Sequence, residues 1–297
     1  MTGDTLRVGL VGAGPWAHKV HAPGIAAHPR TTLVATWARR AEAAAEVAAL
    51  GDATPTTDFD ELLGQVDAVA FAVPPAVQAP LATKAALAGK HLILEKPVAA
   101  SVDEAQTLVD AVARTGVTSM MMLTFRYAAG TRKWLDDVRA VGDWVGGEAR
   151  WFSGTLIDSM YESSKWRHDG GALADIGPHV FDLLDAALGP VETVEQARFT
   201  APGLWHVMLG HEGGRLSTAT LSMHTPTQPA VTDFAVHGPH GFLAYDASGE
   251  APDRYAVLLD DFTELVAGRT AEHPLDVRRG LHIQRVLGQV SAQLVGG

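Results

Sequence analysis

The sequence contains no cysteine among its 297 residues. This absence excludes disulfides, thiolate zinc sites and cysteine nucleophiles. Positive charge is also short, because 23 Lys and Arg stand against 34 Asp and Glu, a formal net charge of −11. An acidic protein repels phosphate backbones and anionic membrane surfaces. We therefore expect neither nucleic acid nor lipid as its main partner.

Long apolar runs are missing as well. No stretch reaches the roughly 18 residues that a membrane-spanning helix needs, although 47% of the residues are hydrophobic. The opening residues MTGDTLRVGL contain no charged-then-apolar leader, so we expect a cytoplasmic protein. The composition is typical of a folded chain with a well-buried core, and the length suits two domains.

The first 123 residues alternate short β-rich runs with alanine-rich helical stretches. Most of these runs are continuously apolar, as in parallel strands that are covered on both faces. The alternation predicts an α/β domain with a doubly wound parallel sheet over residues 1–123. Its strands are expected at 7–11, 33–37, 67–73, 91–94 and 118–123, and its helices at 40–50, 76–88 and 102–113.

After Leu123 the pattern changes to longer runs separated by Gly- and Pro-containing turns. Consecutive strands with hairpin-like turns predict a largely antiparallel open sheet. We therefore expect an α+β domain over residues 124–297. Its strands are predicted at 148–156, 191–200, 204–210, 215–223 and 231–237, and two closing helices at 255–267 and 276–294.

A glycine-rich turn follows the first predicted strand, with the sequence Gly12-Ala13-Gly14-Pro15-Trp16-Ala17. In this G-x-G-x-x-A pattern Gly12 permits the tight turn, Gly14 lets the backbone approach a pyrophosphate, and Ala17 lets helix and strand pack closely. The helix N-terminus offers N–H groups to the anion, and Pro15 suits a first helical position. A turn that binds nothing is the alternative, but the strand before and the helix after favour dinucleotide binding.

The end of the second predicted strand points to the type of cofactor. An NAD-selective site usually places Asp or Glu there for the ribose 2′-hydroxyl, but the residues are Trp37-Ala38-Arg39-Arg40. Arg39 and Arg40 can clamp a 2′-phosphate, and Trp37 or Arg39 can stack on adenine. An arginine that merely begins a solvated helix is the alternative. We expect NADP(H) rather than NAD(H).

A lysine stands at the end of the fourth predicted strand, in Glu95-Lys96-Pro97. Lys96 at the carboxyl end of a parallel strand would point toward the edge where cofactors bind, and Pro97 fixes the local backbone and is a candidate for a cis peptide bond. Val73 and Pro74 end the third predicted strand on the same edge. We assign Val73, Pro74, Glu95, Lys96 and Pro97 to the cofactor site, and Lys96 also to catalysis.

A second constellation lies at Gly170-Gly171-Ala172-Leu173-Ala174-Asp175-Ile176-Gly177-Pro178-His179. Helical spacing would place Asp175 one turn before His179, with Asp182 on the same face. An Asp in that position can orient the imidazole and stabilise its protonated form, as a general acid–base requires. On a helix, Asp-x-x-x-His also occurs as a simple surface pair.

Taken in this order, these features resemble the Gfo/Idh/MocA family, that is, glucose–fructose oxidoreductase, inositol dehydrogenase and their relatives. The resemblance covers nearly the whole chain, through GLVGAGPWA, AALAGKHLILEKPVA, SSKWRHDGGALADIGPHVFDLL and HPLDVRRGLHIQRVL. It implies a Rossmann domain, an α+β domain whose open sheet supports homodimers or homotetramers, and nicotinamide-dependent hydride transfer at a sugar or polyol carbon. Lys96, Asp175 and His179 match the catalytic positions of the family.

The sequence departs from the family pattern at three positions. Gln78 stands where many relatives have a His, Ala172 replaces a third glycine, and Pro178 replaces a smaller residue. None of these changes removes a reacting group. The chain is also shorter than many relatives, so we expect trimmed substrate loops in the second domain.

Substrate contacts are expected from polar and aromatic residues after the fifth strand and before the GG motif. Donors and aromatic faces of this kind suit a hydroxylated ligand. The candidates are Arg126, Asp158, Trp166 and Arg167, together with His179. We find no His/Asp/Glu cluster that argues for a metal, and we assign His18, His21 and His28 to packing or solubility.

Three functions remain open at this stage. The first is an NAD(P)-dependent oxidoreductase of a sugar, sugar derivative or polyol. The second keeps the fold and the reacting groups but acts on a non-sugar carbonyl, a dihydrodiol or an imine. The third is a non-catalytic NADP-binding sensor or scaffold, for which Lys96, Asp175 and His179 would have no use.

Overall fold

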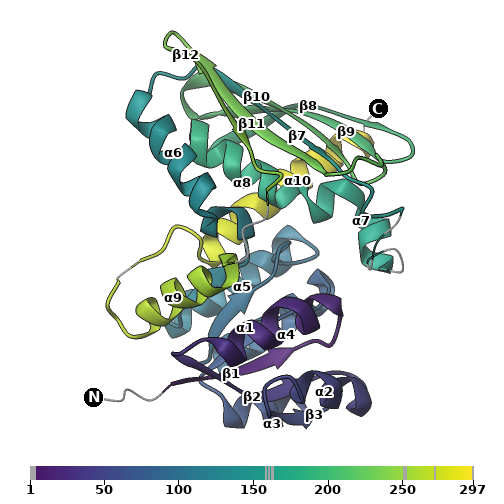
Figure 1. Cartoon of the computed structure of the whole chain (residues 1–297), viewed down its shortest axis with the longest axis vertical. Helices are drawn as coiled ribbons and strands as arrows, with labels where there is room; N and C mark the ends of the chain where they lie inside the picture. Colours follow the sequence, from purple (N-terminus) through teal and green to yellow (C-terminus); the bar gives the residue numbers. More distant parts are fainter. Residues whose placement is uncertain are drawn as a thin grey trace. The chain divides into compact units, whose positions relative to one another are not determined.

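The computed structural model of the chain describes residues 5–157, 159, 161, 164–249, 253–270 and 272–295. The chain forms two compact units, Met1–Met122 with Asp253–His282 and Leu123–Pro252 with Ile283–Gly297. Each unit is built on one six-stranded sheet, and Figure 1 labels the strands and helices. No helix within the described ranges is long and apolar enough to cross a membrane.

The sheet of the first unit is parallel throughout, in the order β3-β2-β1-β4-β5-β6. This order confirms the predicted doubly wound sheet, because the chain starts at the centre and winds outward in both directions. β4 is buried throughout and β1 is buried from Val8 to Val11, as the continuous apolar runs predict. The strands are β1 (Leu6–Val11), β2 (Thr31–Trp37), β3 (Thr54–Thr56), β4 (Ala68–Phe71), β5 (His91–Leu94) and β6 (Ser119–Met121).

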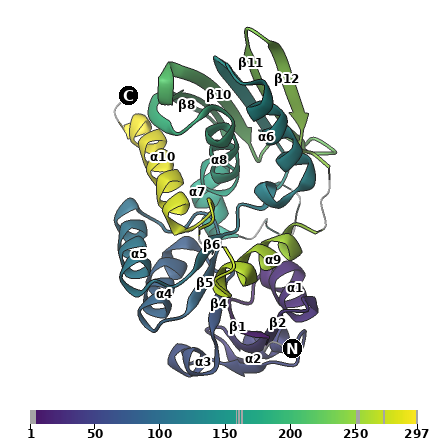
Figure 2. The ribbon, with the colours of Figure 1, turned by 90° about the vertical axis from the view of Figure 1, so that its left-hand side faces the viewer.

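Helices cover both faces of this sheet. Figure 2 shows α4 and α5 on one side of the strands and α1 and α9 on the other. Crossover helices on two faces bury the apolar side chains of both faces of the parallel strands. The helices are the π-helical η1 (Ala17–His21), α1 (Ala22–Ala27), α2 (Ala41–Ala48), α3 (Phe59–Gln65), α4 (Pro75–Leu87), α5 (Val102–Thr115) and α9 (Arg254–Val266).

The segment with α9 belongs to the first unit, although the sequence placed it in a second domain running over 124–297. The amide of Met121 in β6 donates to the carbonyl of Leu275 at 2.7 Å, and the amide of Val277 donates to the hydroxyl of Ser119 at 3.1 Å. These bonds fasten the returning chain to the edge strand β6. The two units therefore differ from the contiguous halves 1–123 and 124–297.

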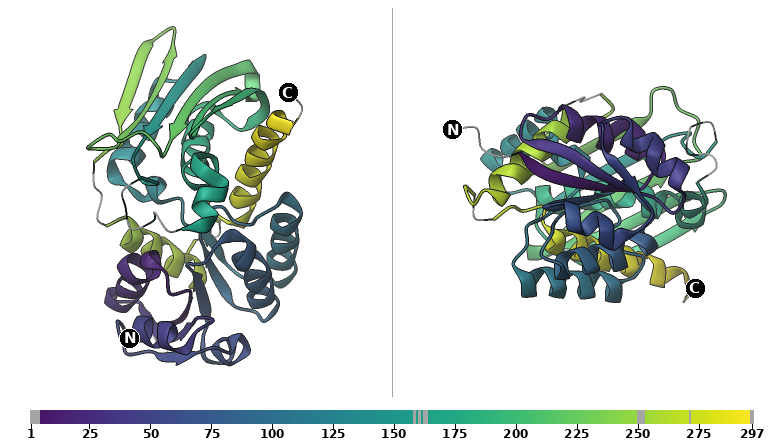
Figure 3. Two further views of the ribbon diagram at one scale, coloured as in Figure 1. Left: turned by 90° about the vertical axis from the view of Figure 1, so that its right-hand side faces the viewer. Right: turned by 90° about the horizontal axis from the view of Figure 1, so that it is seen from below.

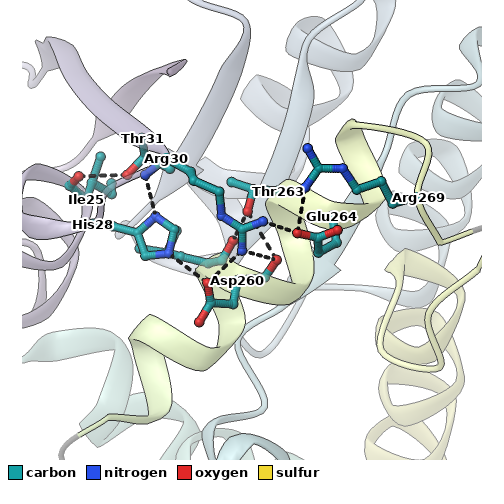
Figure 4. A network of polar contacts seen from close by, with 9 residues as sticks. Ile25, His28, Arg30, Thr31, Asp260, Thr263, Glu264 and Arg269 are labelled. Atoms are coloured by element: carbon teal, nitrogen blue, oxygen red, sulfur yellow. Dashed lines mark hydrogen bonds and ion pairs between the residues drawn. The ribbon is translucent and has the colours of Figure 1, made fainter. Parts of the chain in front are cut away.

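A polar network fastens α9 to the start of β2, as Figure 4 shows. The guanidinium of Arg30 binds Asp260 at 2.6 Å and also binds Glu264, while His28 lies 3.3 Å from Asp260. Burial acts to raise the pKa of Asp260, but the hydrogen bonds from Arg30 and His28 outweigh it, and the pKa is lowered. Asp260 thus stays ionised and keeps Arg30 in place between two carboxylates.

The second sheet runs in the order β12-β11-β7-β10-β9-β8 and is antiparallel except for the pair β7 and β10. This arrangement confirms the predicted largely antiparallel sheet. Its strands are β7 (Gly146–Phe152), β8 (Val191–Thr200), β9 (Leu204–His211), β10 (Arg215–Ser222), β11 (Val231–Gly238) and β12 (Gly241–Asp246). Its helices are η2 (Thr124–Tyr127), α6 (Ala129–Val141), α7 (Lys165–Asp175), α8 (Gly177–Leu188), η3 (Glu212–Gly214) and, from Ile283 on, α10 (Val277–Val295).

Helices cover one face of this sheet. Figure 3 shows the teal-green and yellow helices, which include α8 and α10, on the same face. Val180 and Leu184 of α8 and Leu287 of α10 share one core with Val207 and Leu221 of the strands. One face of α8 is therefore apolar and packs on the sheet.

Candidate functional site

The glycine turn between β1 and the first helix has the geometry that a pyrophosphate site requires. Gly12 has φ of +121°, and a Cβ there would lie 2.3 Å from the carbonyl oxygen of Ala72, so only glycine fits. A Cβ at Gly14 would meet nothing within 4 Å, which leaves its backbone open to a ligand. Residues 15–27 are helical, and Pro15 is the first of them, as predicted.

The remaining residues of the turn also have the close packing that the glycine-rich pattern predicts. Ala17 is fully buried where the helix packs on the sheet, and Ala13 packs against the small cluster of Ala38, Ala43 and Ala44. The helix opens with the π turn η1 (Ala17–His21), and π turns are frequent at functional sites. The turn fits a dinucleotide, and Gly12–Ala17 are the residues that would hold its pyrophosphate.

The end of β2 presents two arginines and an indole that is already engaged. The Trp37 indole donates to the carbonyl of Thr57 at 2.9 Å and meets Phe59 edge-on. Arg39 and Arg40 are exposed, and Arg40 precedes the first turn of α2 in an extended conformation. Both guanidinium groups are therefore available at the edge where a ribose 2′-phosphate would lie.

A loop held by Gln78 carries Lys96 after β5. The Lys96–Pro97 bond is cis, Pro97 is buried and Lys96 is half-buried. The buried amide of Gln78 donates to the carbonyls of Glu95, Pro97 and Val98 at 2.8–3.3 Å and accepts from the amide of Glu95 at 2.9 Å. A neutral imidazole has only one donor and one acceptor nitrogen, so a histidine could not make this set of hydrogen bonds. Gln78, noted only as a departure in the sequence, thus shapes the loop that carries Lys96.

Replacing Gln78 by Leu is expected to lower the free energy of unfolding by about 3 kcal/mol, because it leaves buried backbone groups without partners. Thermal or urea unfolding measures the change. Gln65→Leu is the matched control, since the Gln65 side chain makes one hydrogen bond, to the carbonyl of Glu61. A Gln78→Leu protein as stable as the Gln65→Leu control would show that the hydrogen bonds of Gln78 do not stabilise the loop.

The turn and the lysine loop touch each other through Glu95. The Trp16 indole donates to the Glu95 carboxylate at 2.6 Å. Val73 is half-buried beside Gly12, and Pro74 is the exposed residue before α4. The predicted cofactor residues after β1, β4 and β5 therefore lie at the carboxyl ends of these parallel strands. Trp37, Arg39 and Arg40 lie at the carboxyl end of the neighbouring strand β2.

In the second unit, the two predicted catalytic residues lie in consecutive helices. Asp175 ends α7 and His179 lies in the first turn of α8, with Ile176 between the two helices. The single predicted helix is therefore divided at Ile176, whose backbone keeps right-handed helical angles (φ −104°, ψ −24°). Pro178 sits in the first turn of α8, where its missing N–H is tolerated.

His179 and Asp175 are both buried in their unit. The imidazole of His179 lies 5.4 Å from the ring of Phe125 and 5.9 Å from that of Trp151, measured between ring centroids. The Asp175 carboxylate accepts a hydrogen bond from Nε of Arg167 at 3.1 Å. Aromatic rings thus fix the plane of the imidazole, and Arg167 fixes the carboxylate.

The predicted substrate residues have different surroundings. The Arg167 guanidinium lies 4.1 Å from the Tyr161 ring and 4.5 Å from the Trp166 ring, so both aromatic rings stack on it. Arg126 instead binds the buried Asp182 at 3.2 Å. That pair is structural in character, because removing either partner would leave a buried charge uncompensated. Asp158 lies outside the described residues.

Sequence reasoning missed two residues of the first unit that lie close to Glu95, the residue before Lys96. His21 and Tyr255 form a buried chain of hydrogen bonds that ends on Glu95. His21 had been assigned to packing or solubility, and no local signal in the sequence relates it to Tyr255. No group of three or more His, Asp or Glu that could hold a metal occurs among the residues with described positions.

A dinucleotide turn on a doubly wound sheet, followed by a largely antiparallel sheet unit, defines a class of nicotinamide-dependent oxidoreductases. The model of an oxidoreductase family with an NAD-binding Rossmann fold, Gfo/Idh/MocA, matches residues 6–123. The model of the GFO/IDH/MocA C-terminal domain matches residues 131–244. The chain belongs to the Gfo/Idh/MocA family, as the sequence motifs predict.

Similar proteins of known name act on sugar-like compounds. A dTDP-3,4-didehydro-2,6-dideoxy-α-D-glucose 3-reductase of Streptomyces violaceoruber is 33% identical over 190 residues, which are 62% of this chain and 55% of that protein. An inositol 2-dehydrogenase of Rhizobium meliloti is 27% identical over 80% of this chain and 71% of that protein. The chain spans little more than half the length of several curated relatives that it matches.

The fold also matches solved structures over nearly the whole chain. The WlbA dehydrogenase of Bordetella pertussis, in complex with NADH and UDP-GlcNAcA, has a TM-score of 0.88 at 24% identity, over 99% of this chain and 97% of that one. At this identity the likeness concerns the fold alone. It supports the two-unit architecture that the motifs predict.

Proposed function

We propose that the protein is an NAD(P)-dependent oxidoreductase that transfers a hydride between a nicotinamide and a carbonyl or carbinol carbon of a sugar, sugar derivative or polyol. One observation carries this proposal: Trp16 of the dinucleotide turn hydrogen-bonds Glu95, the residue before Lys96. This contact ties the residue next to Lys96 to the dinucleotide turn, and in our proposal the Lys96 ammonium lies beside the bound dinucleotide. A protein that only binds the cofactor has no use for a cation there.

The bound nicotinamide would supply or accept the hydride, and the chain would manage charge and protons. In our proposal His179 donates a proton to the substrate oxygen during reduction, or removes it during oxidation. Asp175, held by Arg167, favours the imidazolium form of His179. The Lys96 ammonium offsets the negative charge that develops on the same oxygen.

A second division of roles is compatible with the same residues. Lys96 would then carry the proton, and His179 would orient the substrate. In both divisions one proton moves between a side chain and the substrate oxygen as that oxygen changes from carbonyl to hydroxyl. Trp166 and Arg167 are proposed substrate contacts, because a charged group stacked on aromatic rings suits a hydroxylated ligand. Arg126 is a weaker candidate, since Asp182 holds its guanidinium.

A substrate screen tests the proposal. Sugars, nucleotide sugars, cyclic polyols, non-sugar carbonyls, dihydrodiols and imines are offered with NADPH and with NADH while nicotinamide absorbance is followed. Turnover of sugars or polyols is expected. Turnover of only the other compounds would favour the second reading, and cofactor binding without turnover of any compound would favour a sensor.

For the cofactor, we propose a preference for NADP(H). It rests on the two exposed arginines after β2 and on the lack of an acidic residue at positions 37–40. NADPH is expected to raise the melting temperature more than NADH does at equal concentration. In Arg39→Ala/Arg40→Ala the affinity for NADPH is expected to fall about tenfold or more, because charge-assisted bonds to the 2′-phosphate are lost.

The same titration with NADH serves as an internal comparison and is expected to change little in the double variant. Arg114→Ala, at the end of α5 in the same unit, is the matched surface control. Equal stabilisation of the unmodified protein by both cofactors would contradict the NADP preference.

Self-association through the second sheet is a further part of the proposal, as is a cytoplasmic location. Support comes from Leu216 and Phe242, which lie in this sheet with 48% and 63% of their surfaces exposed. Exposed large apolar side chains on a sheet are candidates for contact with another copy. Light scattering after size exclusion measures whether the protein forms a dimer or a tetramer.

A further inference from the structure

A buried chain of three side chains ends at the lysine loop of the first unit. The imidazole of His21 lies 2.9 Å from the carboxylate of Glu95 through Nε2 and 3.0 Å from the hydroxyl of Tyr255 through Nδ1. His21 is fully buried, and Tyr255 is 6% exposed. These residues come from the first helix, from the loop after β5 and from α9. Local secondary structure therefore does not account for the hydrogen bonds between them.

The hydrogen bonds form a consistent set of donors and acceptors. The Glu95 carboxylate accepts from Nε2 of His21 and from the Trp16 indole on the same oxygen, and its other oxygen accepts from the amide of Lys96 at 3.3 Å. An imidazole that donates through Nε2 can accept from the Tyr255 hydroxyl at Nδ1. Burial, together with the charge of Glu95, raises the pKa of Tyr255 well above its ordinary value, so the phenol keeps the proton that it donates.

The packing around Tyr255 shows that its place is specified closely. A Cβ at Gly24 would lie 2.3 Å from Cδ1 of the Tyr255 ring, so the helix backbone and the ring are in close contact. The His21 and Tyr255 rings meet edge-on with centroids 4.9 Å apart. The α9 helix that carries Tyr255 is itself fixed by Arg30. The hydroxyl therefore reaches His21 from a rigid support.

We infer that His21 and Tyr255 are positioning residues for Lys96: they hold the Glu95 carboxylate so that the Lys96–Pro97 loop keeps its place beside the dinucleotide turn. This inference rests on the proposed function of Lys96. Gln78 fixes the backbone of the same loop, whereas His21 and Tyr255 fix the side chain that precedes the lysine. Both residues act through Glu95 and make no contact with the substrate in this account.

The test compares Tyr255→Phe with Tyr245→Phe. Each change removes one hydroxyl and keeps the ring, and Tyr245 bonds Thr131 at 3.0 Å in the other unit. Tyr255→Phe is expected to lower kcat about tenfold or more with KM nearly unchanged, because small displacements of a reacting group are costly. Tyr245→Phe is expected to leave kcat within about twofold, since the Tyr245 hydroxyl bonds Thr131 of its own unit.

A second readout does not depend on turnover. In the protein without cofactor, peptide mass spectrometry measures the rate at which a reagent that acetylates amines modifies Lys96. Tyr255→Phe and His21→Leu are expected to change this rate at least about threefold, because the loop loses its anchor. His21→Gln, which retains a donor and an acceptor, is expected to restore a rate nearer to that of the unmodified protein.

The outcomes separate the inference from the proposed function. If the unmodified protein turns over no substrate, the proposed function fails, and the Lys96 modification rates alone decide the inference. If Tyr255→Phe matches Tyr245→Phe in both kcat and modification rate, the positioning role is overturned. If His21→Leu does not fold, Tyr255→Phe still decides the question, because it removes a single oxygen atom.

Discussion

Lys96→Met is expected to lower kcat about a hundredfold or more, because methionine keeps much of the length of lysine but loses the charge that offsets a developing alkoxide. Binding of the dinucleotide is expected to survive, since the substitution changes neither the glycine turn nor the hydrogen bonds of Gln78. Steady-state kinetics measure kcat, and quenching of tryptophan fluorescence by the cofactor measures its dissociation constant.

A matched lysine shows whether the loss is specific to position 96. Lys84→Met in α4 removes an exposed charge that pairs with Asp60 in the same unit. We expect Lys84→Met to keep kcat within about twofold, as surface ion pairs contribute little. Turnover by Lys96→Met close to that of Lys84→Met would remove Lys96 from the proposed mechanism.

His179→Ala is the second change with a large expected effect. Removing the proposed proton carrier should lower kcat about a hundredfold or more. The change also leaves a space beside the rings of Phe125 and Trp151, which His179 contacts, so some loss of stability is expected. The kinetics are therefore measured well below the melting temperature of the variant, which a thermal scan determines.

His211→Ala separates loss of the imidazole from loss of stability. His211 is buried in the same unit and bonds the carbonyl of Gly189 at 2.8 Å and the hydroxyl of Ser217 at 2.7 Å. It should lower the melting temperature while leaving kcat nearly unchanged. Equal kcat in His179→Ala and His211→Ala would show that His179 acts only in packing.

The sequence predicted strands well where residues that end a strand bound them on both sides. The strands β5 and β8 have the predicted limits, 91–94 and 191–200, because each run is bounded by residues that end a strand. The short strand β3 (Thr54–Thr56) and helix α3 (Phe59–Gln65) were missed. Three residues that include a proline give no periodic signal, and they form an edge strand, where proline is tolerated.

The site was predictable where chemistry depends on local sequence. Gly12, Gly14 and Lys96 have the expected backbone surroundings because a turn after a strand and a loop after a strand are local features. The return of α9 to the first sheet was not predictable, since it depends on contacts such as Arg30 with Asp260 across more than two hundred residues. The same distance in sequence hides the pairing of His21 with Tyr255.

The helix boundary between Asp175 and His179 shows a third kind of limit. The spacing alone fitted one helix, but α7 ends at Asp175 and α8 begins at Gly177, with Ile176 between them. Glycine and proline near helix ends allow either a start or a break. The choice between them depends on packing against the sheet, which the spacing does not encode.

Isotope transfer examines the chemistry itself. The protein is incubated with NADPH that carries deuterium at both C4 positions of the nicotinamide and with a carbonyl sugar that the screen has selected, and the product is analysed by nuclear magnetic resonance. We predict deuterium at one carbon of the sugar, and none above background when Lys96→Met and His179→Ala are combined. Deuterium-free product from the unmodified protein, or full transfer by the double variant, would contradict a hydride transfer that depends on these two side chains.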